Sequence, residues 1–316
     1  MSEVPKTCKA GVVVKHGQDF KLQVQHVPVP DPGPTEILIR LSATGVCYSD
    51  IHYVLEDLPL PRMGDYGVRS PGHEGAGVVV KIGSLVGNWK VGDRAGVKPT
   101  WDTCMSCDLC WGRHECHCPE AVPTGLKVLV DSELRPGDWA AFLGAGGGVG
   151  HMGVQLAKAM GLRVIGVDAG SDKRKLCMDL GCDKFIDFTK VEYVPEEIMR
   201  ITGKGVDGVF VTATSPASYA IATKMAAIGG RIMCVGMPAS GTAFAGDDPM
   251  FLILRNLKVI GTLTGSLKDT HDALGFAARG LLKPVYQTFS IDRLPEAVDL
   301  LRQGKVAGRC VVDFNA

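Results

Sequence analysis

Four cysteines in one short stretch have the spacing of a zinc site. They follow the order Cys-x2-Cys-x2-Cys-x7-Cys, at Cys104, Cys107, Cys110 and Cys118. A loop with this spacing can wrap a zinc ion with four thiolates, which leaves no open coordination position. The sequence therefore predicts a structural zinc in a polar, irregular lobe that would hold little shape without metal.

A second set of residues has the chemistry of a catalytic metal site. Cys47 and His73 are suitable ligands, and Asp50 and Glu74 are placed to orient them through hydrogen bonds. A buried cysteine and an unrelated histidine would give the same pattern, so this pair alone leaves both interpretations open.

A glycine-rich turn, Gly144–Gly150, indicates a nucleotide site. It follows an apolar run and opens an amphipathic helix, whose first amides can receive a pyrophosphate. Asp168 lies 18 residues after Gly150, where a carboxylate can accept hydrogen bonds from ribose hydroxyls and repel a 2′-phosphate. This favours NAD over NADP, although the nearby positive charges of Lys173 and Arg174 weaken the exclusion of NADP. A carboxylate that only caps a strand end would also fit.

The elements that must position these residues differ between the two parts of the chain. From Trp139 onward, strand patterns alternate with helices, which predicts an α/β fold with a doubly wound parallel sheet. The strand candidates are Trp139 to Leu143, Leu162 to Val167, Lys184 to Ile186, Gly208 to Val211, Arg231 to Val235 and Leu257 to Ile260.

The first helix of this part has an apolar stripe expected to face the sheet, formed by Val149, Met152, Gly153, Leu156 and Met160. The first part, from about Gly11 to Val97, reads as short strands and turns, which predicts a β-rich domain. The tail, with a helix near Leu294–Gln303 and a strand at Arg309–Phe314, is expected to return to it.

The bulk composition excludes several classes of function. Lys plus Arg and Asp plus Glu are 34 each in 316 residues, so no net charge attracts nucleic acid or anionic lipid. No apolar run approaches the length of about 20 residues that a membrane helix needs. The eleven cysteines sit in a long chain without an apolar signal core at its start, which predicts reduced thiols in the cytosol.

Together these motifs resemble the zinc-containing medium-chain alcohol dehydrogenases, and most closely the fungal tetrameric type. The resemblance runs nearly end to end. It is carried by Gly45 to His52, Gly72 to Gly77, the cysteine lobe, Gly144 to Gly150, Phe185 to Phe188, Val235 to Pro238 and Gly308 to Asp313. It implies a Rossmann sheet for residues 122–264 and an incomplete GroES-like catalytic domain for residues 1–121 and 265–316.

The resemblance also implies roles for individual residues. Cys47 and His73 match two ligands of catalytic zinc, and Glu74 matches a glutamate that can approach or transiently coordinate the metal. Ser49 and His52 match a proton relay. The cofactor contacts would come from Thr124, Gly147, Gly148, Val149, Asp168, Lys173, Phe188, Val235, Met237, Thr262, Thr264 and Arg309. Zinc as a Lewis acid would favour loss of the alcohol proton, and hydride would then pass to NAD.

The chain departs from the family pattern between Cys118 and Gly144. Only 25 residues separate them, about forty fewer than is usual in the family. The missing segment normally carries further strands and the third catalytic ligand, a cysteine, whose position falls here on Glu120. Glu120 could ligate zinc through oxygen, and Cys116 is a further candidate. Loss of the strands would leave an unpaired sheet edge or an open core.

Three functions follow from the sequence. The main hypothesis is a zinc-dependent oxidoreductase, expected as a homotetramer, that transfers hydride between a small primary or secondary alcohol, or its aldehyde, and NAD. The alternative is a truncated variant that keeps only NAD binding and the structural zinc. A zinc-ribbon module for nucleic acid rests on the cysteine quartet alone, because Arg113 is the only lysine or arginine between Thr100 and Glu120 and forms no basic patch to contact phosphates.

Overall fold

The chain divides into two compact units. The computed structural model describes residues 4–59, 62–67, 69–97, 103–112, 118, 131–263 and 265–316. The first unit comprises Met1–Pro99 and Tyr286–Ala316, and the second comprises Thr100–Val285. These bounds differ from the expected domain limits, because residues 100–121 and 265–285 group with the second unit.

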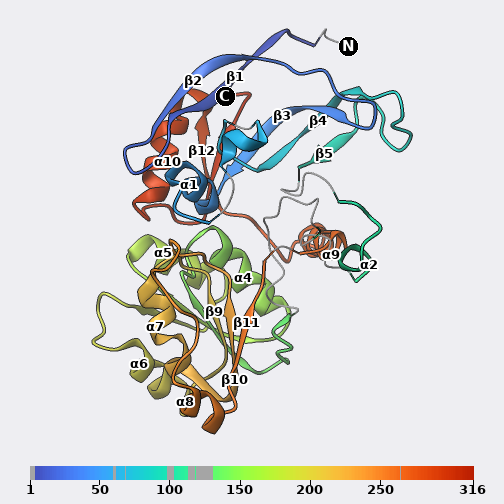
Figure 1. Ribbon diagram of the computed structural model, residues 1–316. Coiled ribbons are helices and arrows are strands. Elements are labelled where there is room, and N and C mark those ends of the chain that lie inside the picture. The colour runs from blue at the N-terminus through green and yellow to red at the C-terminus, as the bar shows by residue number, and fades with distance from the viewer. Residues whose placement is uncertain are drawn as a thin grey trace. The chain divides into compact units, whose positions relative to one another are not determined.

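The second unit is built on a six-stranded parallel sheet (Figure 1), which confirms the doubly wound α/β prediction. Its strand order is β11-β10-β9-β6-β7-β8, so the chain moves outward from β6 in one direction and then in the other. The carboxyl ends of β6 and β9 therefore form the switch point where such sheets bind ligands. The strands are β6 (Trp139–Leu143), β7 (Arg163–Asp168), β8 (Lys184–Asp187), β9 (Val206–Val211), β10 (Ala226–Cys234) and β11 (Lys258–Gly261).

Alternate residues of the central strand serve two separate cores. Ala141 and Leu143 join one cluster, whereas Ala140 and Phe142 join the other. Because successive side chains of a strand point to opposite faces, both faces must be covered, and β6 is buried along its whole length. One face is covered by α6 (Val194–Thr202) and α7 (Pro216–Met225), and the other by α4 (Gly148–Ala159) and α5 (Ser171–Asp179).

The predicted packing face of helix α4 is wrong in part. Of the expected stripe only Gly153 is buried. Leu156 and Met160 are half-buried but pack against the core as predicted, and Val149 and Met152 are half-buried. The buried face also contains small or medium residues, including Gly150, Val154 and Ala157. Small residues are needed on this face because the helix lies close to the sheet. A Cβ atom on Gly153 would lie 2.6 Å from the Phe142 ring.

The first unit contains two open sheets. The antiparallel pair β1 (Thr7–Lys15) and β2 (Lys21–Pro28) forms one of them. The other has the order β12-β13-β3-β4-β5. Its strands are β12 (Tyr286–Ser290), β13 (Arg309–Asp313), β3 (Ile37–Val46), β4 (Glu74–Ile82) and β5 (Arg94–Gly96). Within the described residues, β5 ends this sheet without a further neighbour, in line with the expected open edge.

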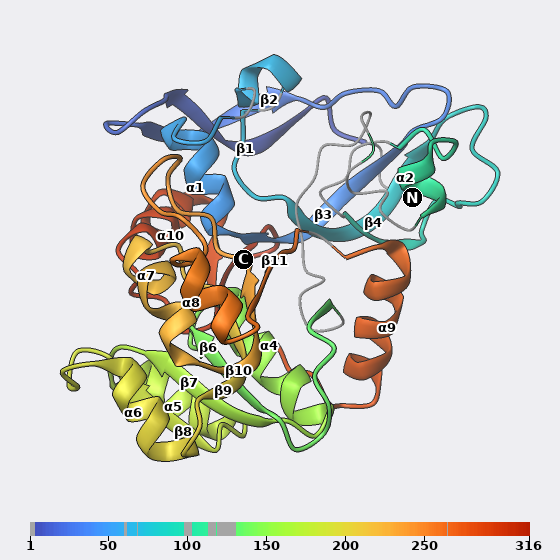
Figure 2. The ribbon, with the colours of Figure 1, turned by 60° about the horizontal axis from the view of Figure 1, so that its bottom comes forward.

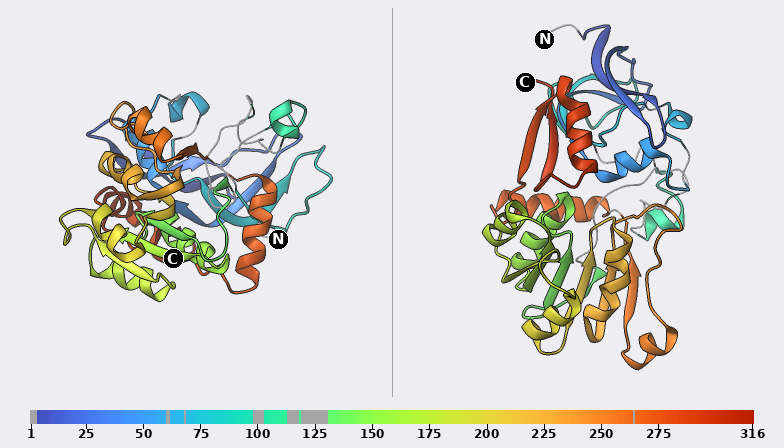
Figure 3. Two further views of the ribbon diagram at one scale, coloured as in Figure 1. Left: turned by 90° about the horizontal axis from the view of Figure 1, so that it is seen from below. Right: turned by 90° about the vertical axis from the view of Figure 1, so that its left-hand side faces the viewer.

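The C-terminal tail returns to the first unit, as predicted. Strand β13 pairs with β3, with Cys310 opposite Val46. Helix α10 (Leu294–Arg302) packs beside β12 and β13 (Figure 3). Its Leu294 and Val298 join a core with residues of α1 (Tyr48–Leu55). The tail therefore anchors the helix that follows Cys47.

Helix α9 (Leu267–Ala278) stands to one side of the six-stranded sheet (Figure 2). Its described side chains are exposed or half-buried, and Leu274 is 66% exposed. The remaining helices are short: α2 (Asp108–Trp111) and α8 (Pro249–Leu254), with 3-10 turns at Met63–Tyr66 and Ile291–Arg293. Over the part of the chain that the structure describes, no helix is long and apolar enough to span a membrane.

Candidate functional site

The cysteine lobe brings its four sulfur atoms together. Cys104, Cys107, Cys110 and Cys118 place their Sγ atoms within 4.8 Å of one another. Cys104 Sγ lies 3.6 Å from Cys118 Sγ and 3.9 Å from Cys110 Sγ. Four sulfurs at about 2.3 Å around a tetrahedral zinc would be about 3.8 Å apart, so the lobe fits this ion.

Hydrogen bonds prepare this lobe for a cation. The amide of Cys107 donates to Cys104 Sγ at 3.3 Å, and the amide of Cys104 donates to Cys118 Sγ at 3.4 Å. Donors from Ser106 and Cys107 lower the pKa of the Cys104 thiol to about 6, whereas burial and the neighbouring thiols raise that of Cys110 to about 12. A bound metal would therefore displace the remaining thiol protons.

The second ligand set lies in the first unit, around the start of helix α1. Cys47, His73 and Glu74 place one ligand atom each within 4.8 Å of one another. Asp50 is only 4% exposed, and it accepts hydrogen bonds at 2.8 Å from the amides of Cys47 and Gly72 and from His73 Nδ1. Asp50 therefore makes a hydrogen bond that orients His73, as the sequence predicts. With Nδ1 held in this way, His73 Nε2 is left to face the ligand set.

Two glycines make room for this arrangement. Gly72 has a φ of +105°, a left-handed conformation that side chains rarely adopt. A Cβ atom on Gly45 would lie 2.1 Å from Glu74 Oε2. The Glu74 carboxylate therefore occupies the space above Gly45, its partner in the β3–β4 register.

Arg309 lies beside the same ligand set and forms an ion pair with Glu74. Burial alone would raise the pKa of the Cys47 thiol, but the Arg309 charge and a hydrogen bond with His73 lower it overall. Burial lowers the pKa of His73, but Asp50 and Cys47 outweigh it and raise the value to about 10. These residues thus form a compact cluster of opposite charges.

Ser49 and His52 are both buried on helix α1. His52 Nδ1 lies 2.6 Å from Asp57 Oδ1, and the Tyr48 and His52 rings pack edge to face with their centroids 5.1 Å apart. Its Nε2 atom has no hydrogen-bond partner among the described residues. Asp57 therefore fixes the ring and leaves Nε2 available.

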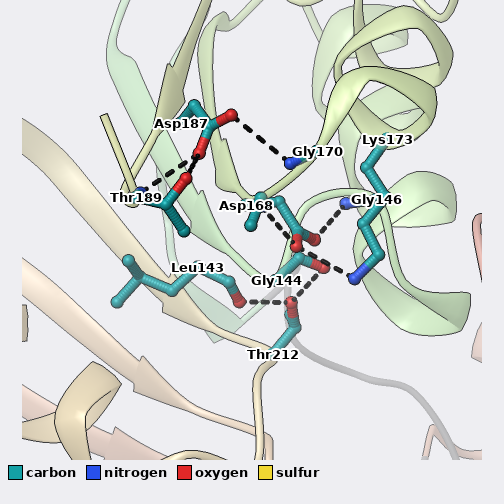
Figure 4. A network of polar contacts seen from close by, with 10 residues as sticks. Leu143, Gly144, Gly146, Asp168, Gly170, Lys173, Asp187, Thr189 and Thr212 are labelled. Atoms are coloured by element: carbon teal, nitrogen blue, oxygen red, sulfur yellow. Dashed lines mark hydrogen bonds and ion pairs between the residues drawn. The ribbon is translucent and has the colours of Figure 1, made fainter. Parts of the chain in front are cut away.

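The nucleotide turn joins β6 to α4 in the second unit. Gly144 has a φ of +86°, and a Cβ atom on Gly150 would lie 2.1 Å from the carbonyl oxygen of Gly144. Asp168, 5% exposed, accepts hydrogen bonds from the amides of Gly146 at 2.9 Å and Ala169 at 2.8 Å. Lys173 Nζ lies 3.0 Å from the same carboxylate (Figure 4).

Sequence comparisons identify the family. Residues 33–156 match the model of the alcohol dehydrogenase GroES-like domain, and residues 148–279 match that of the zinc-binding dehydrogenases. An alcohol dehydrogenase of Schizosaccharomyces pombe is 36% identical over 353 residues, which cover 99% of each chain. The chain belongs to the zinc-containing alcohol dehydrogenase family. Its 316 residues leave at least 37 of those 353 positions unfilled, which fits the expected internal deletion.

Solved structures of alcohol dehydrogenases have the same fold. A structure described as an NAD-dependent alcohol dehydrogenase has a TM-score of 0.81 and 27% identity, covering 97% of this chain and 99% of that one. The alcohol dehydrogenase of Aeropyrum pernix has a TM-score of 0.82 and covers 97% and 100%, but at 21% identity it shows the fold alone.

The other residues expected at the cofactor lie mostly at the carboxyl ends of strands. Phe188, Val235 and Thr262 follow β8, β10 and β11 directly, at the edge where members of this family carry the nucleotide site. Met237 lies two residues beyond Val235. Gly147 is the N-cap of α4, and Gly148 and Val149 are its first residues. Thr124 and Thr264 lie outside the described residues, as do Glu120 and Cys116.

Several polar residues near these sites were not predicted from the sequence. Asp187 accepts hydrogen bonds from Thr189 and Gly170, and Thr212 donates to the carbonyl oxygens of Leu143 and Gly144 (Figure 4). Asp187 ends a parallel strand next to Asp168, and this strand-end position is the signal that could have identified it. Asp57 follows helix α1 and has no comparable signal.

Proposed function

We propose that this chain is an oxidoreductase that transfers hydride between a small primary or secondary alcohol and NAD. The observation that carries the proposal is the Cys47, His73 and Glu74 set, held by the buried Asp50 beside Ser49 and His52. A zinc ion held there by Cys47, His73 and Glu74 would supply a Lewis acid that makes an alcohol hydroxyl more acidic.

Side chains of this protein would then accept and transfer the proton of the alcohol hydroxyl. Ser49 would accept a hydrogen bond from the alcohol and pass the proton toward His52. Because Asp57 accepts a hydrogen bond from His52 Nδ1, the free Nε2 is the acceptor, and the Asp57 carboxylate stabilises the imidazolium that forms. Asp57 therefore acts as a positioning residue in this proposal.

The second unit would bind the cofactor. The amides at the start of α4 would receive the pyrophosphate, and Asp168 would accept hydrogen bonds from the adenosine ribose. Lys173 already contacts Asp168, so the ribose would share or replace that contact. Phe188, Val235, Met237, Thr262 and Arg309, with Thr124 and Thr264, are proposed as further contacts.

The test is NAD reduction by zinc-loaded protein with a series of short primary and secondary alcohols. Turnover that depends on His52 is expected, so His52→Gln should lower kcat about 10²- to 10⁴-fold while NAD affinity is kept. The matched control is His271→Gln, which changes an exposed histidine of α9. Absence of turnover with every alcohol would contradict the proposal.

A second candidate function has two observations in its favour. The ion pair between Arg309 and Glu74 and the absence of a cysteine at position 120 both weaken a catalytic metal site. In that case the chain would bind NAD and structural zinc without chemistry. Calorimetry separates the two candidates, because saturable NAD binding without turnover would support the second and exclude the first.

The substrate class, the oligomeric state, the cellular compartment and the domain boundaries are also proposals. Small primary or secondary alcohols or the corresponding aldehydes are the proposed substrates, and a homotetramer in the cytosol is the proposed state. Light scattering coupled to gel filtration measures the number of subunits in the assembly. The functional boundaries near residues 121 and 265 are proposed from the family resemblance.

A further inference from the structure

Two cysteines meet at the C-terminal end of helix α5 in the second unit. Cys177 lies in the last turn of the helix, and Cys182 follows shortly after its end. The amide of Cys182 donates to the carbonyl oxygen of Cys177 at 3.0 Å, and the amide of Gly181 donates to that of Met178 at 3.0 Å. With Gly181 at a φ of +96°, these are the two hydrogen bonds of a Schellman cap. The cap therefore joins the two cysteines through their backbones.

The same cap brings the two side chains together. In a Schellman cap, the side chains at the positions of Cys177 and Cys182 commonly form an apolar contact. Both are buried, at 0% and 5% exposure, in one core of the sheet. A hydrogen bond with the Cys182 thiol, together with burial, raises the pKa of the Cys177 thiol. A disulfide needs Cα atoms about 4.4–6.8 Å apart, and a direct backbone hydrogen bond holds two residues within that span.

The residue that follows the cap is tied to the sheet. The amide of Asp183 donates to the carbonyl oxygen of Val164 at 2.8 Å. Its carboxylate accepts hydrogen bonds from the amide of Val164 at 2.6 Å and from Lys158 Nζ at 2.7 Å. The two cysteines are therefore held close by a fixed path of the chain on both sides of the cap.

The two thiols differ in their access to solvent. Cys177 is fully buried, and its raised pKa keeps it protonated. Cys182 keeps 5% exposure, and α5 packs beside β7 and β8, the last two strands in the order of the sheet. The end of a short helix at such an edge opens at a lower cost than the whole unit unfolds. Cys182 is therefore the thiol that a small neutral oxidant reaches first.

We propose that Cys177 and Cys182 are a site of reversible oxidation to a disulfide, with hydrogen peroxide as the oxidant. Peroxide first converts the Cys182 thiol to a sulfenic acid, and one water molecule is released. The Cys177 sulfur then forms the S–S bond, and its proton leaves with the sulfenic hydroxyl as a second water. The two thiols lose two electrons and two protons, which reduce one peroxide to two waters. A dithiol reductant reverses the reaction by thiol–disulfide exchange.

The disulfide would lock the end of the helix that carries Lys173, which lies one turn before Cys177. A covalent link across the cap makes local opening rarer, so amide exchange in residues 176–182 should slow about tenfold on oxidation. The reaction uses no metal ligand, alcohol or nucleotide. The inference therefore stands or falls independently of the proposed function.

The experiment is peroxide treatment of the zinc-loaded protein, followed by denaturation, alkylation and digestion with trypsin. Cleavage after Lys175 and Lys184 releases both cysteines in one peptide. We expect this peptide to lose two hydrogen atoms, to bind no alkylating reagent, and to regain both thiols after reduction with dithiothreitol. The matched control is Cys310, which is equally buried but donates to the carbonyl oxygen of Ala297. It should be alkylated with and without peroxide.

Two variants separate the two steps of the reaction. Cys177→Ser should leave Cys182 as a sulfenic acid that dimedone traps, because the second thiol is gone. Cys182→Ser should leave Cys177 reduced, because peroxide does not reach it. Thermal melting of each variant checks that it is folded, and oxidation of the exposed Cys8 in the same digest shows that peroxide has acted.

Three results would overturn the inference. The first is full alkylation of the 176–184 peptide in samples where Cys8 is oxidised. The second is a disulfide that forms only when urea is present during the peroxide treatment. The third is oxidation of Cys177 in Cys182→Ser as fast as that of Cys182 in Cys177→Ser. None of these results bears on hydride transfer, which is measured separately with alcohol and NAD.

Discussion

Asp50 in the first unit and Asp168 in the second have the same local arrangement. Each carboxylate is buried and accepts hydrogen bonds from two backbone amides and one ionisable side chain. The difference is in that side chain. Asp50 holds the rigid ring of His73, whereas Asp168 holds the flexible end of Lys173.

The difference indicates that Asp50 positions a ligand residue, whereas Asp168 can bind a ligand with its own oxygens. A ring fixed through Nδ1 directs Nε2 elsewhere, so Asp50 acts on a ligand through His73. An ammonium group can rotate away, so Asp168 can offer its own oxygens to a bound molecule. Substitution of Asp50 should therefore affect metal affinity, and substitution of Asp168 should affect the choice of nucleotide.

The cysteine lobe provides an extreme case, because the amides of Cys104 and Cys107 donate to sulfur atoms of other ligands, Cys118 and Cys104. Removal of zinc with a strong chelator should have the largest effect of all, since structural zinc contributes about 10–16 kcal/mol of apparent binding free energy in small domains. We expect new protease cleavage within residues 103–112, while amide exchange near Asp50 and Asp168 stays slow. Re-addition of zinc should reverse the cleavage, and continued protection without zinc would contradict the prediction.

Asp50→Asn should have the next largest effect. One amide nitrogen of the new side chain would face a donor, which should lower the free energy of unfolding by about 1–3 kcal/mol. Metal affinity at Cys47 should fall about 10- to 100-fold, measured by cobalt titration. Asp93→Asn is the control, because Asp93 accepts one exposed amide hydrogen bond, from Lys90. Equal effects of the two substitutions would remove the special role of Asp50.

Asp168→Asn should change cofactor choice more than stability. Loss of the negative charge should lower the preference for NAD over NADP about tenfold, measured by calorimetry with each nucleotide. Asp187→Asn is a matched comparison, because Asp187 is buried and holds Gly170 and Thr189. It should cost similar stability without changing the preference. An unchanged preference in Asp168→Asn would mean that this carboxylate only caps its strand.

Lys173→Met should have the smallest effect. Methionine keeps part of the apolar stem, and Asp168 keeps its hydrogen bonds from the amides of Gly146 and Ala169, so the loss of stability should be about 1 kcal/mol. The midpoint of urea unfolding should hardly move, and NAD affinity should fall by less than in Asp168→Asn. A loss as large as that of Asp168→Asn would show that Lys173 belongs to the recognition surface.

The sequence predicted the second unit well because its signals are local. Six buried apolar runs bounded by turn residues match the six strands within a few residues, apart from the longer start of β10. The face of α4 was predicted less well. A pattern that favours large side chains overlooks glycine, yet Gly153 is what lets the helix approach Phe142.

The site was predictable where short motifs carry it. Cys47, His73 and Glu74 meet as the family resemblance implies, and the cysteine lobe follows from its spacing. The contact of Glu74 with Arg309 was not predictable, because 235 residues separate the two and their meeting depends on strand register. The role of Asp57 depends in the same way on how helix α1 ends.

One further feature concerns the segment just before β12. Gln155 on α4 holds both the amide and the carbonyl of Lys283, and His151 Nε2 accepts the amide of Val285. The side chains of residues 283–285 are exposed, so only their backbone is used. The side chains of this segment can therefore vary, whereas an insertion or deletion would move the backbone groups that Gln155 and His151 bind. Proline is tolerated at position 284 because the amides that form these hydrogen bonds belong to residues 283 and 285.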